Sequence, residues 1–285
     1  MNKYLKEKLF KVLMYISVLI VAASLLLIVG INLVKGGWVI LKDPSIIITA
    51  PGPTYLLGGE GGFLHALLGS LYMVIPSTCI ATFLAVFIAR FMQVDYMRPR
   101  FADQIRILFD VLWGIPSIIF GIFVLNILMN INARGSLLAA IITLSLLELP
   151  IIVRYIDEAL SAVPHGIRES MYSLGATKLE TSRIITKYAL PGITAGVLLG
   201  MGRAIGDAAS VVFTAGASNT MCTGLLQSAT SLPLLIFLQA NSYYPSVRSH
   251  AYAASFVLIL IILFLNIISR ISAKRFKRYT NGGKK

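Results

Sequence analysis

The chain has 285 residues, of which 57% are hydrophobic and 13% are charged, and its mean hydropathy is +0.82. Because about 25% of the residues in a soluble domain are charged, this composition excludes an ordinary globular protein and indicates a membrane protein with several spans. The net charge of +13 therefore bears on which side of a membrane the basic residues occupy, and we expect no nucleic-acid partner.

Uncharged stretches suited to crossing a lipid bilayer occur at six places in the chain, since a helix needs about 20 apolar residues to do so. We expect an all-α integral membrane protein whose residues 1–285 form a single transmembrane domain. The predicted spans are, approximately, residues 12–34, 67–89, 111–129, 137–153, 190–214 and 251–269. The first is too long for a signal-peptide core, and we expect a retained span.

The distribution of Lys and Arg predicts that both termini are cytoplasmic. With the N-terminus inside, 20 of the 25 basic residues fall in inner segments and four in outer loops, which is the asymmetry of the positive-inside rule. The remaining one, Arg203, lies inside the fifth predicted span. Residues 223–240 are also apolar, but Pro233 and two Gln residues argue against a lipid-facing helix. We expect this segment to be an outer loop, either amphipathic or re-entrant.

The segment between the fourth and fifth spans, residues 154–189, is too polar to cross a bilayer and contains helix signals. Pro164 suits a first helical turn, a short helix is expected over residues 165–174, and Gly175 can end it in a left-handed conformation. Thr177 begins the sequence TKLE, a capping box that starts a second helix. On local physics alone, this segment is an amphipathic connector at the inner face of the membrane.

Three motifs in chain order resemble those of one transport family. The loop from Glu169 through Gly175 to Ile185 resembles the EAA loop of ABC-importer permeases. LWGIPSIIFGIF at residues 112–123 and GRAIGDAAS at residues 202–210 resemble stretches of phosphate-specific permeases. The short N-terminus and the sequence GGEGGFLHALLGS before the second span resemble the PstA-type subunit more than its PstC-type partner.

The resemblance implies the type I ABC-importer permease fold and a multi-pass subunit of the cell membrane that forms half of a pathway for inorganic phosphate. The partners implied are a second permease subunit, a dimer of ATPase subunits, an external phosphate-binding protein and the lipid bilayer. The loop would dock on the ATPase. The residues implied in this coupling are Arg168, Glu169, Ser170, Gly175, Ala176 and Thr177.

The chain has no GxxxxGK[ST] loop, so it cannot cradle ATP phosphates itself. We expect no catalytic residue and no cofactor in this chain, with ATP and Mg²⁺ bound by the partner ATPase. We also expect no metal site, because Cys79 and Cys222 lack CxxC or His spacing.

Charged residues within or next to the predicted spans are candidates for the translocation pathway, since a charge at the centre of a bilayer costs at least about 2.5–3.5 kcal/mol. Arg203 and Asp207 are four apart and would share a helix face. Either they only neutralise each other, or Arg203 offers phosphate oxygens a planar fork that Asp207 positions. Glu148 is uncharged, paired with Arg203, or directed at the partner subunit. Arg154 lines the inner mouth or anchors at the headgroups.

The motifs also depart from the family pattern, which leaves other functions open. Ser170 and Met171 replace paired alanines, and Asp207 stands where Glu is common. One alternative is a permease for another oxyanion, such as sulfate or molybdate. A second is an ATP-independent channel or secondary transporter in which the loop at residues 154–189 is only structural.

Overall fold

The computed structural model describes residues 3–129 and 135–281, and the regular elements in this part of the chain are helical. The elements are α1 (Lys3–Lys42), the 3-10 turns η1 (Pro44–Ile47) and η2 (Tyr55–Leu57), α2 (Leu64–Phe91), α3 (Pro99–Gly114), α4 (Ser117–Met129), α5 (Leu137–Ser161), α6 (His165–Ser173), α7 (Lys178–Ile205), α8 (Leu232–Gln239) and α9 (Pro245–Asn281). Five helices are long and apolar enough to span a membrane, or up to six if α3 and α4 form one span. The all-α, multi-span fold class is thereby confirmed.

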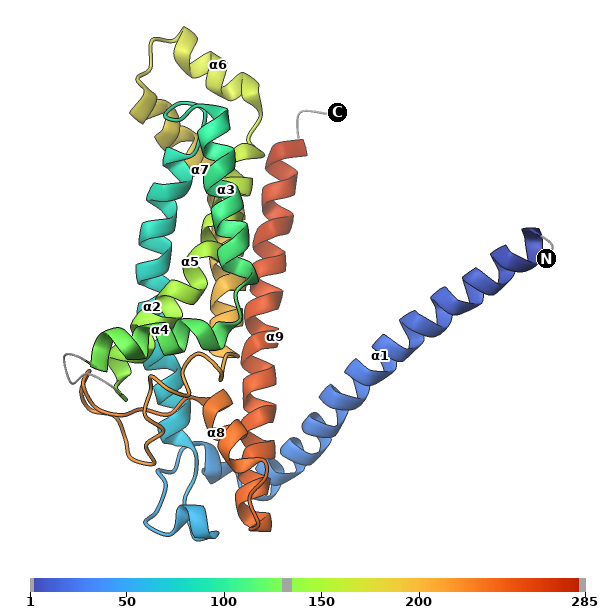
Figure 1. The fold of residues 1–285 in the computed structure, drawn as a ribbon, viewed down its shortest axis with the longest axis vertical. Coiled ribbons are helices and arrows are strands. Elements are labelled where there is room, and N and C mark those ends of the chain that lie inside the picture. The colour runs from blue at the N-terminus through green and yellow to red at the C-terminus, as the bar shows by residue number, and fades with distance from the viewer. Residues whose placement is uncertain (1–2, 130–134, 282–285) are drawn as a thin grey trace.

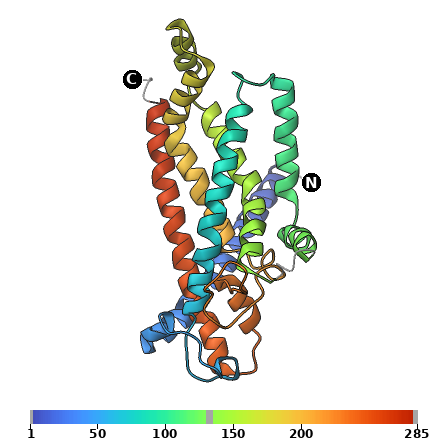
Figure 2. The ribbon, with the colours of Figure 1, turned by 90° about the vertical axis from the view of Figure 1, so that its left-hand side faces the viewer.

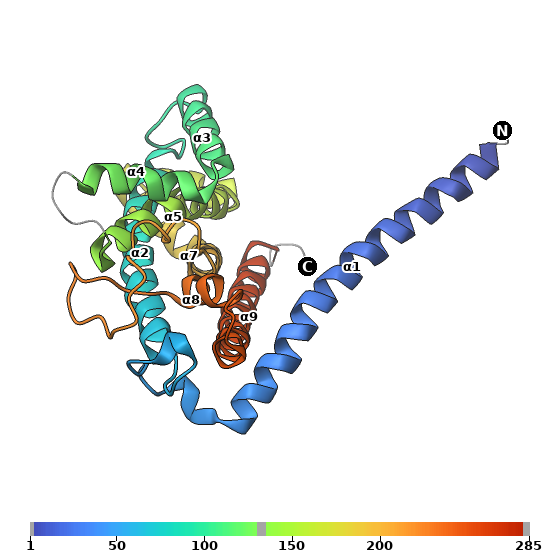
Figure 3. The ribbon, with the colours of Figure 1, turned by 60° about the horizontal axis from the view of Figure 1, so that its bottom comes forward.

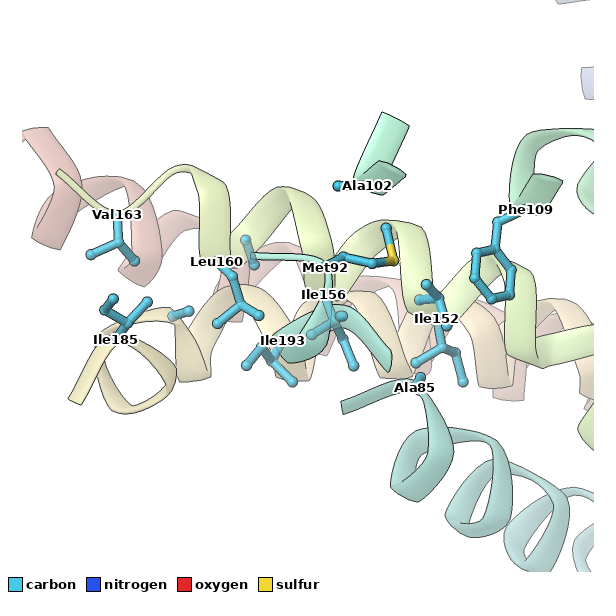
Figure 4. Packing of buried hydrophobic residues seen from close by; sticks show 14 of the residues in the cluster. Ala85, Met92, Ala102, Phe109, Ile152, Ile156, Leu160, Val163, Ile185 and Ile193 are labelled. Carbon is cyan, nitrogen blue, oxygen red and sulfur yellow. The ribbon is translucent and has the colours of Figure 1, made fainter. Parts of the chain in front are cut away.

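The bundle is formed by α2, α5, α7 and α9, which run side by side in Figures 1 and 2. Helix α5 is the most deeply buried of the candidate spans. At the end of the bundle nearest α6, apolar side chains from α2, α3, α5 and α7 form one cluster, shown in Figure 4. Its members include Met92, Phe109, Ile152, Ile156 and Ile185. This cluster fixes the four helices against one another at that end.

Helix α1 contacts the bundle mainly through its C-terminal end and then extends away from it, as Figures 1 and 3 show. Gly36 lies against the Tyr252 backbone and the Phe256 side chain of α9, so a Cβ at this position would clash with the Tyr252 carbonyl oxygen. The apolar stretch of α1 has no buried residue. Most of its surface is therefore available to lipid or to another chain.

The third predicted span, residues 111–129, is not one straight helix. Helix α3 ends at Gly114, α4 begins at Ser117, and the two are bent by 94°. Pro116 explains the break, because a proline pushes the preceding residue out of the helical region. Ile115 accordingly has an extended conformation, with φ −70° and ψ 131°. In Figure 1, α3 runs along the bundle whereas α4 crosses it.

The fifth predicted span, residues 190–214, differs from the structure at both ends. Helix α7 is continuous from Lys178 to Ile205, so it begins earlier and ends earlier than predicted. Helix α5 also extends to Ser161. The connector between α5 and α7 is therefore residues 162–177, which is much shorter than the predicted loop of residues 154–189.

Residues 206–231 contain no helix and pack across the end of the bundle opposite α6 (Figure 2). The first backbone N–H groups of a helix have no partner within it, and this segment supplies partners for α5. Ser136, Leu137 and Leu138 donate to the carbonyls of Thr214, Gln227 and Leu225, each at 2.8 Å. The following helix, α8, has eight residues and is too short to span a bilayer. The prediction that residues 223–240 do not form a spanning helix is confirmed.

Candidate functional site

The predicted helix–turn–helix between α5 and α7 is confirmed. Helix α6 follows Pro164 and contains no buried residue, and Gly175 has a φ of +78°, which glycine adopts without a Cβ penalty. The capping box at the start of α7 is complete. The Thr177 N–H donates to Glu180 Oε2 at 2.8 Å and the Glu180 N–H donates to Thr177 Oγ1 at 3.3 Å. Helix α6 thus projects as a defined unit from one end of the molecule (Figure 1).

The residues predicted to couple this unit to a partner divide into two groups. Three of them make contacts within the chain: Arg168 pairs with Asp95 at 3.0 Å, the Ser170 hydroxyl donates to the Gly166 carbonyl at 2.7 Å, and Thr177 caps α7. Glu169 and Gly175 are exposed, and Ala176 is half-buried.

The tip of the unit also exposes apolar side chains, since Leu174 is 83% exposed and Leu179 is 57% exposed. These two side chains are free, within this chain, to contact another protein.

Asp95, in the turn between α2 and α3, is a residue that sequence reasoning missed. Besides the ion pair with Arg168, it accepts a hydrogen bond from the Tyr172 hydroxyl. Burial and the neighbouring Asp95 carboxylate raise the pKa of the Tyr172 phenol. Asp95 is 73 positions from Arg168, and no local pattern connects them.

A second charged cluster joins α3 to α5. Asp157 of α5 is 3% exposed and accepts from Arg106 through both carboxylate oxygens, at 2.8 and 3.2 Å. The Gln93 side-chain amide also donates to Asp157, at 2.9 Å. Arg154 pairs with Asp110 of α3 at 2.8 Å. Arg154 is therefore held by α3, and its place at an inner mouth stays a prediction.

The spacing of the charges on α3 is the sequence signal that could have indicated this cluster. Asp103, Arg106 and Asp110 are three and four residues apart, which places them on one face of a helix. All three positions precede the third predicted span, residues 111–129, so the prediction of spans alone does not reveal this face.

Arg203 and Asp207 do not share a helix face, so the predicted pairing is wrong. Arg203 lies in the last turn of α7, which ends at Ile205, and Asp207 follows the C-cap residue Gly206. Asp207 Oδ1 accepts a hydrogen bond from the Ser210 backbone N–H at 2.9 Å. Arg203 is exposed, and it takes part in none of the ion pairs found in the described residues.

Glu148 is 0% exposed and lies between α5 and α2, so the alternatives that it pairs with Arg203 or faces a partner subunit are wrong. The Ser77 hydroxyl oxygen lies 2.8 Å from Glu148 Oε1 and 2.9 Å from the Val74 carbonyl oxygen. Ser77 has one hydroxyl hydrogen and can donate in only one of these contacts. If Ser77 donates to the Val74 carbonyl, an uncharged Glu148 can donate to the Ser77 oxygen. Its burial does not fit direct contact with a solute in this conformation.

The broken span reaches the end of α7. Gly121 of α4 lies against the Ser210 backbone, and a Cβ at this glycine would clash with the Ser210 carbonyl oxygen. Helix α4 is thereby seated on the turn that Asp207 closes. Helix α4 therefore contacts the segment that follows the end of α7.

The bundle of long apolar helices and the exposed helix–turn–helix define a helical membrane protein with several candidate spans. The family model "Binding-protein-dependent transport system inner membrane component" matches residues 81–278. The chain belongs to this family. It is therefore an inner membrane transport component rather than an enzyme.

Several phosphate transport system permease proteins named PstA are similar in sequence. That of Yersinia pestis is 32% identical, with 74% of this chain and 72% of the relative covered. That of Haemophilus influenzae is 33% identical, with 74% of this chain and 76% of the relative covered. A probable PstA of Methanocaldococcus jannaschii is 32% identical, with 78% of this chain and 79% of the relative covered. The predicted resemblance to the PstA type is confirmed.

A solved structure shares the fold. An inward-facing form of the MetNI methionine ABC transporter has a TM-score of 0.59 at 19% identity, with 76% of this chain and 95% of that chain covered. The ABC-importer permease fold predicted from the sequence is thereby confirmed.

Proposed function

We propose that this chain is one of two permease subunits of an ATP-driven importer of inorganic phosphate. The relatives that support this cargo are phosphate transport permeases that are 32–33% identical over about three quarters of the chain. The other subunits would be a second permease, a pair of ATPases and an external phosphate-binding protein. ATP and Mg²⁺ would be bound by the ATPases, and this chain would hold no cofactor.

The observation that carries the proposal is the continuity of α7. This one helix begins at the capping box beside the exposed tip and contains Arg203 in its last turn. Arg203 follows Lys178 by 25 residues, which at 1.5 Å per residue places the two roughly 38 Å apart along the axis. A displacement imposed on α6 and the turn at Gly175 would therefore be transmitted toward Arg203 along a single helix, which contains Pro191. The exposed Leu174 and Leu179 would contact the ATPase.

Arg203 suits a role in an anion pathway because its guanidinium is always charged and presents several N–H donors in one plane. No carboxylate in the described residues forms an ion pair with it, and Asp207 accepts a hydrogen bond from the Ser210 N–H. In a dry cavity between two permeases, Arg203 would attract a phosphate oxygen, and closure of the ATPases would alter access to it. Arg154 and Glu148 would support the helices around this pathway rather than line it.

Phosphate uptake into vesicles that contain all subunits, with and without ATP, tests the proposal. We expect uptake to require ATP, to be competed by unlabelled phosphate but not by equal sulfate, and to fall at least tenfold in Arg203→Gln. Asp207→Asn is the matched control, because its amide oxygen can still accept from Ser210. Uptake by this chain alone without ATP would instead establish a channel or secondary transporter, and preference for sulfate or molybdate would establish the other-oxyanion alternative.

A further inference from the structure

The α2–α3 turn and α6 are joined by a carboxylate that the proposed function does not use. We propose that Asp95 is a positioning residue that fastens α6 to this turn, so that α3 and α4 move together with the coupling loop. This inference rests on the proposed function, since it assigns Asp95 a part in transmitting the movement of the ATPases.

Asp95 holds α6 at two points. Arg168 pairs with its Oδ2 at 3.0 Å, and the Tyr172 hydroxyl donates to its Oδ1. These two partners are four residues apart on α6, one helical turn, so they fix the orientation of the helix as well as its distance. The side chains of Asp95 and Arg168 are only 4% and 14% exposed. A shielded, charge-assisted contact of this kind is stronger than an ion pair on an open surface.

The turn that carries Asp95 is itself held tightly. The backbone N–H groups of Tyr96 and Met97 both donate to the Gln93 carbonyl, at 3.0 and 3.1 Å. Met92 is 1% exposed and belongs to the apolar cluster between the helices. Displacement of Asp95 therefore displaces Gln93 as well, because the backbone between them cannot extend without breaking these hydrogen bonds.

From Gln93 the contacts continue to α3. The Gln93 amide donates to Asp157 at 2.9 Å, and Asp157 binds Arg106 of α3 through both oxygens. The pair between Arg154 and Asp110 joins the same two helices one helical turn further along. Helix α3 is thus held to α5 by a shielded contact at Asp157, whose side chain is 4% exposed, and by a more exposed pair at Asp110, whose side chain is 49% exposed.

Helix α3 leads, through the break, to the turn beyond Arg203. The bend of 94° turns the chain into α4, whose Gly121 lies against the Ser210 backbone. A movement of α6 therefore has two routes to the same region. One runs directly along α7, and the other runs through Asp95, α3 and α4. Arg203 and the segment that follows it would then move together.

The test uses the complete transporter in vesicles, with three measurements: retention of the ATPases during purification, ATP hydrolysis, and phosphate taken up per ATP hydrolysed. In Asp95→Asn we expect the ATPases to be retained and ATP to be hydrolysed, with phosphate uptake per ATP lowered five- to tenfold. Asp95→Glu, which keeps the charge, is expected to restore most of the ratio. Glu7→Gln is the control, because Glu7 forms an exposed pair with Lys11 far from these contacts.

An unchanged uptake ratio in Asp95→Asn overturns the inference. If Asp95→Asn fails to assemble, Tyr172→Phe is the deciding variant, because it removes only one hydroxyl. We expect phosphate uptake per ATP to fall two- to threefold in Tyr172→Phe. An uptake per ATP equal to that of the parent overturns the inference. Failure of the proposed function is recognised separately, because the unmodified complex would then show no ATP-dependent phosphate uptake.

Discussion

Replacing Asp157 by Asn is the sharpest test of the charged cluster between α3 and α5. The Asp157 side chain is 4% exposed and that of Arg106 is 27% exposed. Removing one partner of a fully buried ion pair costs about 3–5 kcal/mol, because the other charge is left without compensation. Arg106 is partly exposed and Asn retains one acceptor oxygen, so we expect a smaller loss, about 2–3 kcal/mol in the free energy of unfolding.

The assay can be made local to this interface. The chain contains two Trp residues, and Trp113 of α3 lies 6.2 Å from the Tyr155 ring of α5, measured between ring centroids. In a Trp38→Phe background, Trp113 fluorescence therefore reports separation of α3 from α5. Denaturant titration of this protein in mixed micelles, with and without Asp157→Asn, gives the difference in the free energy of unfolding.

Asp103→Asn is the matched control for this measurement. Asp103 also pairs with Arg106, at 2.8 Å, but its side chain is 64% exposed. Exposed pairs contribute about 0–1 kcal/mol, so the control should change the transition little. If Asp157→Asn destabilises the protein no more than Asp103→Asn does, burial does not strengthen the cluster and the reasoning is refuted.

Three further predictions concern single positions. Gly121→Ala should destabilise the bundle by about 1–3 kcal/mol in the same titration, because its Cβ would meet the Ser210 backbone, whereas Gly114→Ala, with open space around it, should not. Gly175→Ala should lower the free energy of unfolding by about 1 kcal/mol through strain at positive φ alone, since nothing lies within 4 Å of the added Cβ. Equal stability of the variant and the parent would argue against this conformation. The free energy of unfolding of Glu148→Gln should stay within about 1 kcal/mol of the parent, because an amide can donate to Ser77, whereas Glu148→Ala should lose about 2–4 kcal/mol. Equal losses in the two variants would contradict an uncharged Glu148.

Composition and local signals predicted much of the fold, since each acts over a short stretch of chain. Uncharged runs placed most of the spans, and the capping box at Thr177 placed the start of α7 correctly. Pro116 is a local signal for a break, but the apolar run around it predicts one crossing. The apolar run around Arg203 likewise predicts a span that continues past Gly206, where the helix ends.

The partners of the charged side chains could not be predicted, because they are set by packing between distant segments. Asp95 and Arg168 are separated by 73 residues, and Ser77 and Glu148 by 71. The four-residue spacing of Arg203 and Asp207 predicted a contact that is absent, because it assumed a helix that does not continue. Spacing therefore identified candidate charges, whereas the structure decides which of them are already satisfied.

That distinction bears on where a translocation pathway would lie. Arg106 and Arg154 are satisfied by carboxylates within the chain, and Arg90 donates to the Ser182 hydroxyl at 3.0 Å. Arg203 has no ion-pair partner in the described residues and is exposed, and nothing lies within 4 Å of a Cβ built at the neighbouring Gly202. An unpaired arginine is costly in a bilayer unless it faces water or an anion. Arg203 therefore suits a surface that a second permease would cover, which supports the proposal that two subunits share the pathway.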